Sequence, residues 1–138
     1  MVCLQGLHTG RHCVFAMHVH LVFVAKYRRK VFDGDAIDRL RSTFCHVCEE
    51  FGATLVEMDG EADHVHLLVN YPPSVPVSKL VNSLKGASSR RLRVDRPSIA
   101  NRTVWRSALW SPSYFAASCG GAPIAIVRQY IEQQATPD

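Results

Sequence analysis

Alternating apolar and polar residues make the segment from Cys13 to Lys26 the first clear element of the chain. A period of two residues is typical of a β-strand, because successive side chains of a strand point to opposite faces. One predicted face carries His18 and His20. The other face is expected to pack in the core, and it comprises Phe15, Met17, Val19, Leu21 and Phe23.

A helical period follows the turn at Asp33-Gly34. Apolar residues at three- and four-residue spacing predict an amphipathic helix with one buried face. We expect Asp35 to cap the amino end of this helix and Gly52 to end it. The predicted buried positions are Ile37, Leu40, Phe44, Val47 and Phe51.

Two more strands and a second helix come next. The segments Thr54 to Met58 and Asp63 to Tyr71 are separated by a short turn around Gly60, which predicts an antiparallel hairpin. A helix is predicted to begin at about Pro76, because proline suits the first turn of a helix. Its predicted buried stripe comprises Val77, Leu80, Val81, Leu84 and Leu92.

The last part of the chain completes the fold. Arg96 to Ser107 is predicted to be a polar connection and Leu109 to Ala116 a fourth strand. After a flexible break at Gly120-Gly121, Pro123 to Gln134 is predicted to be a short helix. The order strand, helix, strand, strand, helix, strand predicts the α+β class. We expect a ferredoxin-like (RRM-like) antiparallel sheet with two helices on one face and an added C-terminal helix.

Composition limits the number of domains and the compartment. With 138 residues, 47% hydrophobic and 20% charged, the chain is expected to form one compact domain over residues 12–138, preceded by a flexible tail over residues 1–11. The apolar segment Val14 to Ala25 is too short to cross a membrane, and no signal-peptide pattern is present, so we expect a cytoplasmic protein. Five irregularly spaced cysteines predict free thiols, and Cys45 and Cys48 are expected to pack in the core rather than bind a metal.

The sequence Asp63-His64-Val65-His66 is the sharpest candidate for chemistry. On a strand, His64 and His66 share a face, and two imidazoles side by side are half of a metal site. The alternative is that both are polar residues on a solvated face. His18 and His20 form a rival pair, and Asp63 beside the first pair favours His64 and His66. The next position on their face is Leu68, which argues against a histidine-triad nucleotide hydrolase.

The C-terminal helix offers possible partners for this pair. Tyr130 and Gln134 are one turn apart and share a face of the helix. If a cation held by two imidazoles and an amide oxygen polarised a phosphodiester, the phenol could attack the phosphorus. The alternative is that Tyr130 is a half-buried packing residue.

Charge adds a possible partner. The chain has 16 Lys and Arg against 12 Asp and Glu, a net of +4. The basic residues gather in two clusters, which suggests contact with a polyanion, although a merely solvated face is the alternative. The residues of these clusters that could contact such a polyanion are Lys26, Arg28, Arg29, Lys85, Arg90 and Arg91.

Five ordered motifs carry a resemblance to a known family. Over about His12 to Gln134 the chain resembles the small single-tyrosine HUH transposases of bacterial and archaeal insertion sequences, the IS200-like group. The motifs are Lys26 to Phe32, Asp63 to Leu68, Ser78 to Gly86, Trp110 to Phe115 and Arg128 to Gln134.

The resemblance implies an enzyme that cleaves and rejoins single-stranded DNA at hairpin-bearing insertion-sequence ends. Tyr130 would be the nucleophile and would form a 5′-phosphotyrosine bond, leaving a free 3′-OH. His64, His66 and Gln134 would hold a divalent metal, Mg²⁺ or Mn²⁺. The resemblance also implies a homodimer and no nucleotide cofactor.

Two other functions compete with this interpretation. A replication initiator or relaxase uses the same chemistry but usually has larger domains. A non-catalytic ferredoxin-like nucleic-acid-binding module would explain the fold and the basic residues. Such modules need exposed aromatic side chains on their central strands, and here the corresponding strand supplies His64 and His66 instead.

Overall fold

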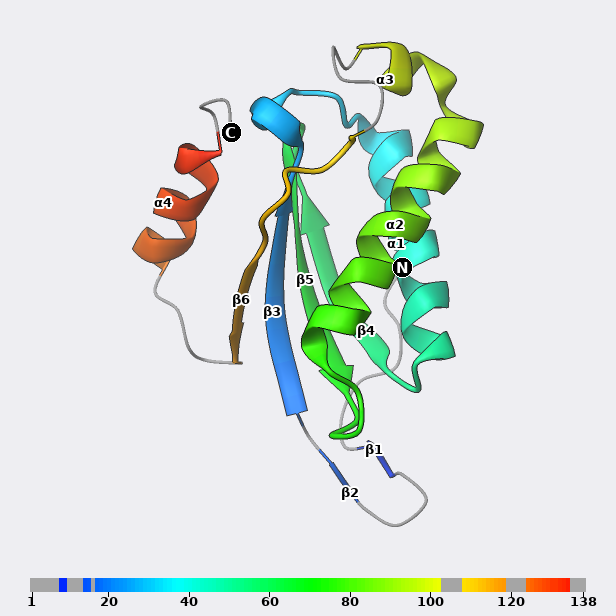
Figure 1. The fold of residues 1–138 in the computed structure, drawn as a ribbon, viewed down its shortest axis with the longest axis vertical. Coiled ribbons are helices and arrows are strands. Elements are labelled where there is room, and N and C mark those ends of the chain that lie inside the picture. The colour runs from blue at the N-terminus through cyan, green and yellow to red at the C-terminus, as the bar shows by residue number, and fades with distance from the viewer. Residues whose placement is uncertain (1–7, 10–13, 16, 103–107, 119–123, 135–138) are drawn as a thin grey trace.

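A four-stranded antiparallel sheet organises the protein (Figure 1). The computed structural model describes residues 8–9, 14–15, 17–102, 108–118 and 124–134. The sheet order is β4-β5-β3-β6, which is the order of a ferredoxin-like fold, so the predicted fold class is confirmed. Its strands are β3 (Met17–Val24), β4 (Thr54–Gly60), β5 (His64–Tyr71) and β6 (Phe115–Ser118).

Helices cover the two faces of the sheet unequally. Helices α1 (Gly34–Glu50) and α2 (Val77–Asp95) pack side by side on one face, and α4 (Ile124–Gln133) lies on the other (Figure 1). Beneath α1 and α2, the ring of Phe23 meets Phe44 and Trp110 edge to face, at centroid distances of 5.9 and 5.8 Å. The main core therefore lies on the α1 and α2 side.

The amino end of α1 differs from the prediction. Asp33 is the cap, because its carboxylate accepts a hydrogen bond of 2.9 Å from the backbone N–H of Ala36. Arg96, at the end of α2, binds both Asp33 and Asp35 through its guanidinium nitrogens. The prediction of Asp35 as the cap was wrong, and Asp35 instead lies in the first turn as a partner of Arg96 and Arg39.

Other elements also begin or end at residues that differ from the prediction. The predicted polar connection after Arg96 contains the short helix α3 (Pro97–Arg102), and the predicted fourth strand begins only at Phe115. Trp110 makes one isolated bridge to Ala25 instead. Two residues of the expected tail form β1 (His8–Thr9), which pairs with β2 (Val14–Phe15).

The cysteines follow the prediction only in part. Cys45 and Cys48 are both buried on α1, as expected for packing residues. Cys48 is a free thiol whose burial raises its pKa to about 12. Cys45 is disulfide-bonded, so the prediction of free thiols was wrong at this position.

Candidate metal and nucleophile site

The register between β3 and β5 places the histidines on the face that α1 and α2 do not cover. In the antiparallel ladder, His64 lies opposite Val24 and His66 lies opposite Val22. Val65, in contrast, points into the main core. The predicted orientation of the histidine pair is therefore confirmed.

His64 contacts the carboxylate of Asp63, which in turn binds Arg28 from the turn after β3. Its Nδ1 lies 2.7 Å from Asp63 Oδ1, and Arg28 Nε donates to Asp63 Oδ2 over 2.8 Å. Burial alone would raise the pKa of Asp63, but hydrogen bonds from His64 and Arg28 outweigh it and lower the pKa. The ionised carboxylate accepts from Nδ1–H, which leaves Nε2 of His64 as the nitrogen with a lone pair for a cation.

The backbone of Arg28, whose side chain binds Asp63, has an unusual conformation. Tyr27 and Arg28 have φ values of 60° and 56°, in the left-handed region that non-glycine residues rarely adopt. Each such residue costs roughly 1–2 kcal/mol. The structure thus holds two strained residues beside the carboxylate that orients His64.

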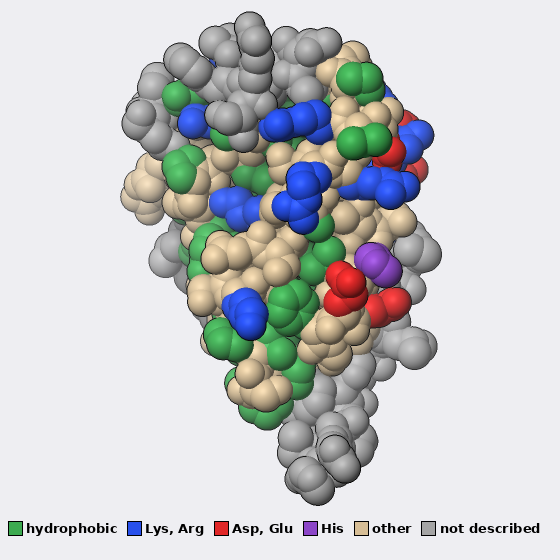
Figure 2. All heavy atoms as spheres, turned by 45° about the vertical axis from the view of Figure 1, so that its right-hand side comes forward, with side chains coloured by type: hydrophobic (Ala, Val, Ile, Leu, Met, Phe, Trp, Pro, Cys, Tyr) green, Lys and Arg blue, Asp and Glu red, His purple; other side chains and the backbone are tan. Residues whose placement is uncertain are grey.

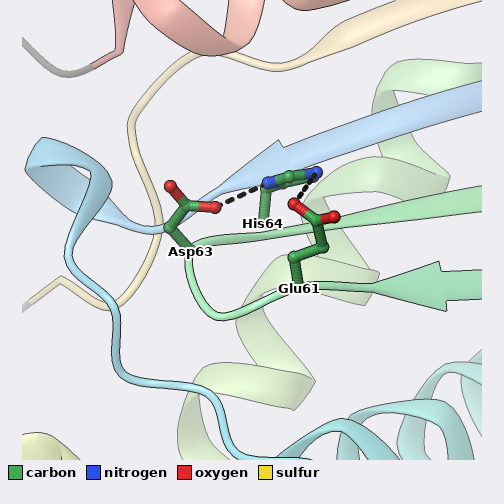
Figure 3. A group of neighbouring side chains, drawn as sticks. All are labelled: Glu61, Asp63 and His64. Carbon is green, nitrogen blue, oxygen red and sulfur yellow. Dashed lines mark hydrogen bonds and ion pairs between the residues drawn. The ribbon is translucent and has the colours of Figure 1, made fainter.

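Glu61 joins this group on the exposed side of the turn between β4 and β5 (Figure 3). Its Oε2 lies 3.8 Å from His64 Nε2, the nitrogen that Asp63 leaves available. Candidate ligand atoms of Glu61, Asp63 and His64 all lie within 4.8 Å of one another, so the three residues could hold a metal ion. Sequence analysis missed Glu61, whose only signal was an acidic residue next to the predicted turn.

His66 stands beside His64 and contacts a third imidazole. The rings of His64 and His66 have centroids 4.9 Å apart. His66 Nδ1 lies 3.3 Å from Nε2 of His20, and these two rings stack with centroids 5.4 Å apart. Burial, followed by the neighbouring His64 and His20, lowers the pKa of His66 and favours its neutral form. A neutral imidazole is the form that binds a metal.

The side chains gathered at this turn offer both nitrogen and oxygen donors to a cation. Imidazole nitrogens alone would suit zinc or copper, whereas carboxylate and amide oxygens suit Mg²⁺ and Mn²⁺. His64 and His66 supply the nitrogens, and Glu61 adds a carboxylate at the same turn. Such a mixed set of nitrogen and oxygen donors could hold a divalent cation.

Helix α4 lies on the same face of the sheet as the histidine pair. Its Ile131 is buried against Val22 and Val24, the residues opposite His66 and His64. Neighbouring strands are about 4.8 Å apart. The buried contact of α4 is therefore only one strand away from both histidines.

Tyr130 and Gln134 both contact the segment that leads into β6. The hydroxyls of Tyr130 and Ser113 are 2.9 Å apart, and the Tyr130 ring lies 5.8 Å from that of Phe115. Gln134 Oε1 accepts hydrogen bonds from Ser111 over 2.5 Å and from Ser113 over 3.3 Å. The structure thus brings the predicted nucleophile and the predicted third ligand together, on the far side of β3 from the histidine pair.

Lys85, on α2, binds the backbone of the segment that leads into β6. Its ammonium donates to the carbonyl oxygens of Ser111 and Ser113 over 2.7 and 3.1 Å. Burial lowers the pKa of Lys85 to about 8. Sequence analysis assigned no role to either serine, although both lie in the motif Trp110 to Phe115.

The other predicted DNA contacts are distributed over two regions. Lys26, Arg28 and Arg29 are half-buried at the end of β3, near Asp63. Arg90 and Arg91 are exposed on α2. With Arg39 and His46 they line an open groove of about 750 Å³ between α1 and α2. Figure 2 shows lysine and arginine side chains gathered on the side of the molecule that bears α1 and α2.

Comparison with known proteins identifies the family of the chain. The sequence profile of the family described as "Transposase IS200 like" matches residues 13–134. The chain is 34% identical to the ISDra2 transposase TnpA of Deinococcus radiodurans over 125 residues, covering 91% of this chain and 89% of that protein. It is 30% identical to the transposase for insertion sequence element IS200 of Salmonella typhimurium over 131 residues, covering 95% and 82%.

Solved structures give the same result. A transposase structure from Deinococcus radiodurans superimposes with a TM-score of 0.80 at 32% identity, covering 92% of this chain and 97% of that one. A tyrosine transposase bound to a REP hairpin shares the fold, with a TM-score of 0.54 at 11% identity and coverage of 93% and 69%.

Fold and site together define an α+β protein whose ferredoxin-like sheet presents paired histidines beside a C-terminal helix. The chain belongs to the IS200-like transposase family. None of the described helices has the length and apolar character that crossing a membrane requires.

Proposed function

We propose that this chain is a metal-dependent transposase that cleaves and rejoins single-stranded DNA at insertion-sequence ends, with Tyr130 as the nucleophile. The observation that carries the proposal is the packing of Ile131 on Val22 and Val24, the strand partners of His66 and His64. This packing puts the tyrosine helix and the histidine pair on one face of the sheet.

The metal ligands that we propose are His64, His66 and Gln134, with Mg²⁺ or Mn²⁺ as the cation. Asp63 supports the first ligand by accepting from Nδ1 of His64. When bound, the cation polarises the scissile phosphate and orients it. The amide oxygen of Gln134 accepts from Ser111 and Ser113 in this structure, so holding a cation would require it to give up those hydrogen bonds.

The reaction that we propose exchanges one phosphate ester for another. The phenolic oxygen of Tyr130 loses its proton and attacks the phosphorus, forming a 5′-phosphotyrosine bond. The bond from phosphorus to the 3′ oxygen breaks, and that oxygen takes up a proton to become the free 3′-OH. Rejoining reverses these steps with a different 3′-OH, so no nucleotide cofactor is needed.

The partners that we propose are hairpin-bearing single-stranded DNA and a second copy of the chain. A related fold bound to a REP hairpin supports the first. The phosphates of the DNA would contact the basic side chains at the end of β3 and on α2. We also propose that residues 12–138 form the transposase domain and that the protein works in the cytoplasm. The proposed DNA contacts are Lys26, Arg28, Arg29, Lys85, Arg90 and Arg91.

A covalent-adduct assay tests the mechanism. The full chain is incubated with Mn²⁺ and a labelled hairpin oligonucleotide, and the products are separated under denaturing conditions. We expect an adduct that disappears with Tyr130→Phe, which removes one oxygen and leaves the contact with Phe115. Tyr71→Phe, on β5, is the matched control and should retain the adduct.

The outcomes separate the two candidate classes. Retained adduct formation by Tyr130→Phe would refute the assignment of the nucleophile. Hairpin binding without any adduct or cleavage, in the presence of Mn²⁺, would instead favour a non-catalytic nucleic-acid-binding module.

A further inference from the structure

A third imidazole touches the histidine pair from the neighbouring strand. His20 on β3 and His66 on β5 lie diagonally across the ladder, because His20 is opposite Leu68 and His66 is opposite Val22. Their rings nevertheless meet, with 3.3 Å between His20 Nε2 and His66 Nδ1. Both side chains are half-buried, so water competes less for this contact than it would on an open surface.

The contact constrains which nitrogen of His66 carries a proton. A neutral imidazole has one N–H and one lone pair. Two nitrogens at hydrogen-bonding distance need one to donate and the other to accept. If His66 donates from Nδ1, its lone pair is on Nε2, which is then the atom that can bind a cation.

His64 already has an acceptor at Nδ1, so its Nε2 carries the lone pair. Asp63 accepts from Nδ1 of His64 and leaves Nε2 for a cation. At His66 the neighbour of Nδ1 is Nε2 of His20. The two histidines are thus supported in parallel ways, one by a carboxylate and the other by an imidazole.

We propose that His20 is a positioning residue that accepts a hydrogen bond from Nδ1–H of His66 and so fixes the ring and the tautomer in which Nε2 binds the metal. This inference rests on the proposed function, since it takes His66 as a ligand. Metal-binding histidines usually donate their other N–H to an acceptor, and loss of such an acceptor typically lowers metal affinity about 10–100-fold.

His18 provides a matched control. It lies two residues before His20, on the same face of β3, and its Nε2 is 3.2 Å from the amide nitrogen of Asn70. His18→Leu removes the same ring from the same strand without touching His66. His20→Leu removes the acceptor, whereas His20→Gln keeps an acceptor oxygen at a similar reach.

The first measurement needs no metal. Long-range ¹⁵N–¹H correlation spectra of the full chain identify the tautomer of each neutral histidine. We expect His66 to carry its proton on Nδ1 in the wild type, in His20→Gln and in His18→Leu, and to lose that preference in His20→Leu. A wild-type His66 protonated on Nε2 would overturn the proposal.

The second measurement is Mn²⁺ affinity by calorimetric titration of the folded proteins. We expect His20→Leu to bind about 10–100-fold more weakly, His20→Gln to recover most of the affinity, and His18→Leu to match the wild type. Equal affinity of His20→Leu and wild type would overturn the proposal. So would a second Mn²⁺ equivalent in the wild type that His20→Leu abolishes, because His20 would then be a ligand itself.

A failure of the proposed function has a different signature. In that case the wild type would not bind Mn²⁺, or His64→Ala would bind it as well as the wild type. In that event the tautomer of His66 still shows whether His20 accepts from its Nδ1–H, although a role in metal binding would be refuted together with the proposed function.

Discussion

The two faces of the sheet use the same strands for different purposes. On β3, the side chains of Leu21 and Phe23 are fully buried under α1 and α2. Their neighbours on the other face include His20, which is half-buried and contacts His66. Because side chains alternate along a strand, a step of one residue separates a packing position from a position available for chemistry. Stability and chemistry can therefore be perturbed independently.

The largest expected effect is the loss of cleavage activity when a histidine of the proposed metal site is replaced. His66→Ala should abolish Mn²⁺-dependent cleavage, because it removes a proposed ligand, and His64→Ala should do the same. The unfolding free energy should fall by only about 1 kcal/mol for His66→Ala, since the side chain is half-buried. Cleavage assays and urea unfolding check the two parts. His18→Ala is the control, and an equal loss of cleavage in that variant would contradict the assignment.

The packed face should show the opposite pattern. Phe23→Ala leaves a cavity between Phe44 and Trp110 and should lower the unfolding free energy by about 3–5 kcal/mol. Urea unfolding measures this loss. Any of the variant that remains folded at low temperature should still bind Mn²⁺ with an affinity close to that of the wild type. Loss of Mn²⁺ binding by protein shown to be folded would mean that the two faces are coupled.

Lys85 should give a smaller effect that depends on pH. Its pKa is about 8 in the folded protein and 10.5 ordinarily. Between these values the unfolded chain binds a proton that the folded chain lacks, so the contribution of this lysine makes stability rise with pH. Unfolding free energies measured between pH 7.5 and 9.5 should rise less in Lys85→Met than in the wild type. Parallel curves for the two proteins would show that the pKa of Lys85 is not lowered.

The smallest expected effect is a change in DNA affinity when an arginine of α2 is replaced. Arg90→Ala should lower the slope of log affinity against log salt by about 1, because one phosphate contact is lost. Hairpin titrations at several salt concentrations measure this slope. Arg39 is the comparison, because its guanidinium already pairs with Asp35 and Asp95. If both variants change the slope equally, the groove between α1 and α2 contributes only general positive charge.

Local patterns in the sequence were enough to predict most of the fold. The alternation of β3 and the hairpin of β4 and β5 are local features. The hairpin is confirmed, and the predicted core face of β3 is confirmed at Val19, Leu21 and Phe23. Met17 was predicted to lie on that face, but it is exposed near the end of the sheet. The cap of α1 could not be assigned in this way, because Arg96 binds Asp33 from 63 residues away. The late start of β6 has a similar origin, since Lys85 on α2 binds the backbone carbonyls of Ser111 and Ser113.

The candidate site was predictable only as separate parts. The pair His64 and His66 follows from strand alternation, and the proximity of Tyr130 and Gln134 follows from the helical period. The contact between His20 and His66 depends on the register of β3 against β5, which local periodicity does not specify. The place of Glu61 beside Nε2 of His64 depends on the conformation of the turn between β4 and β5.

The left-handed backbone at Tyr27 and Arg28 has a consequence for protein engineering. A redesign that ranks residues by backbone preference alone would choose glycine at position 28, since glycine adopts positive φ at little cost. That choice would delete the guanidinium that pairs with Asp63, the carboxylate that orients His64. Automated stabilisation of this scaffold should therefore exclude position 28, where the strained residue is also the one that supports the candidate site.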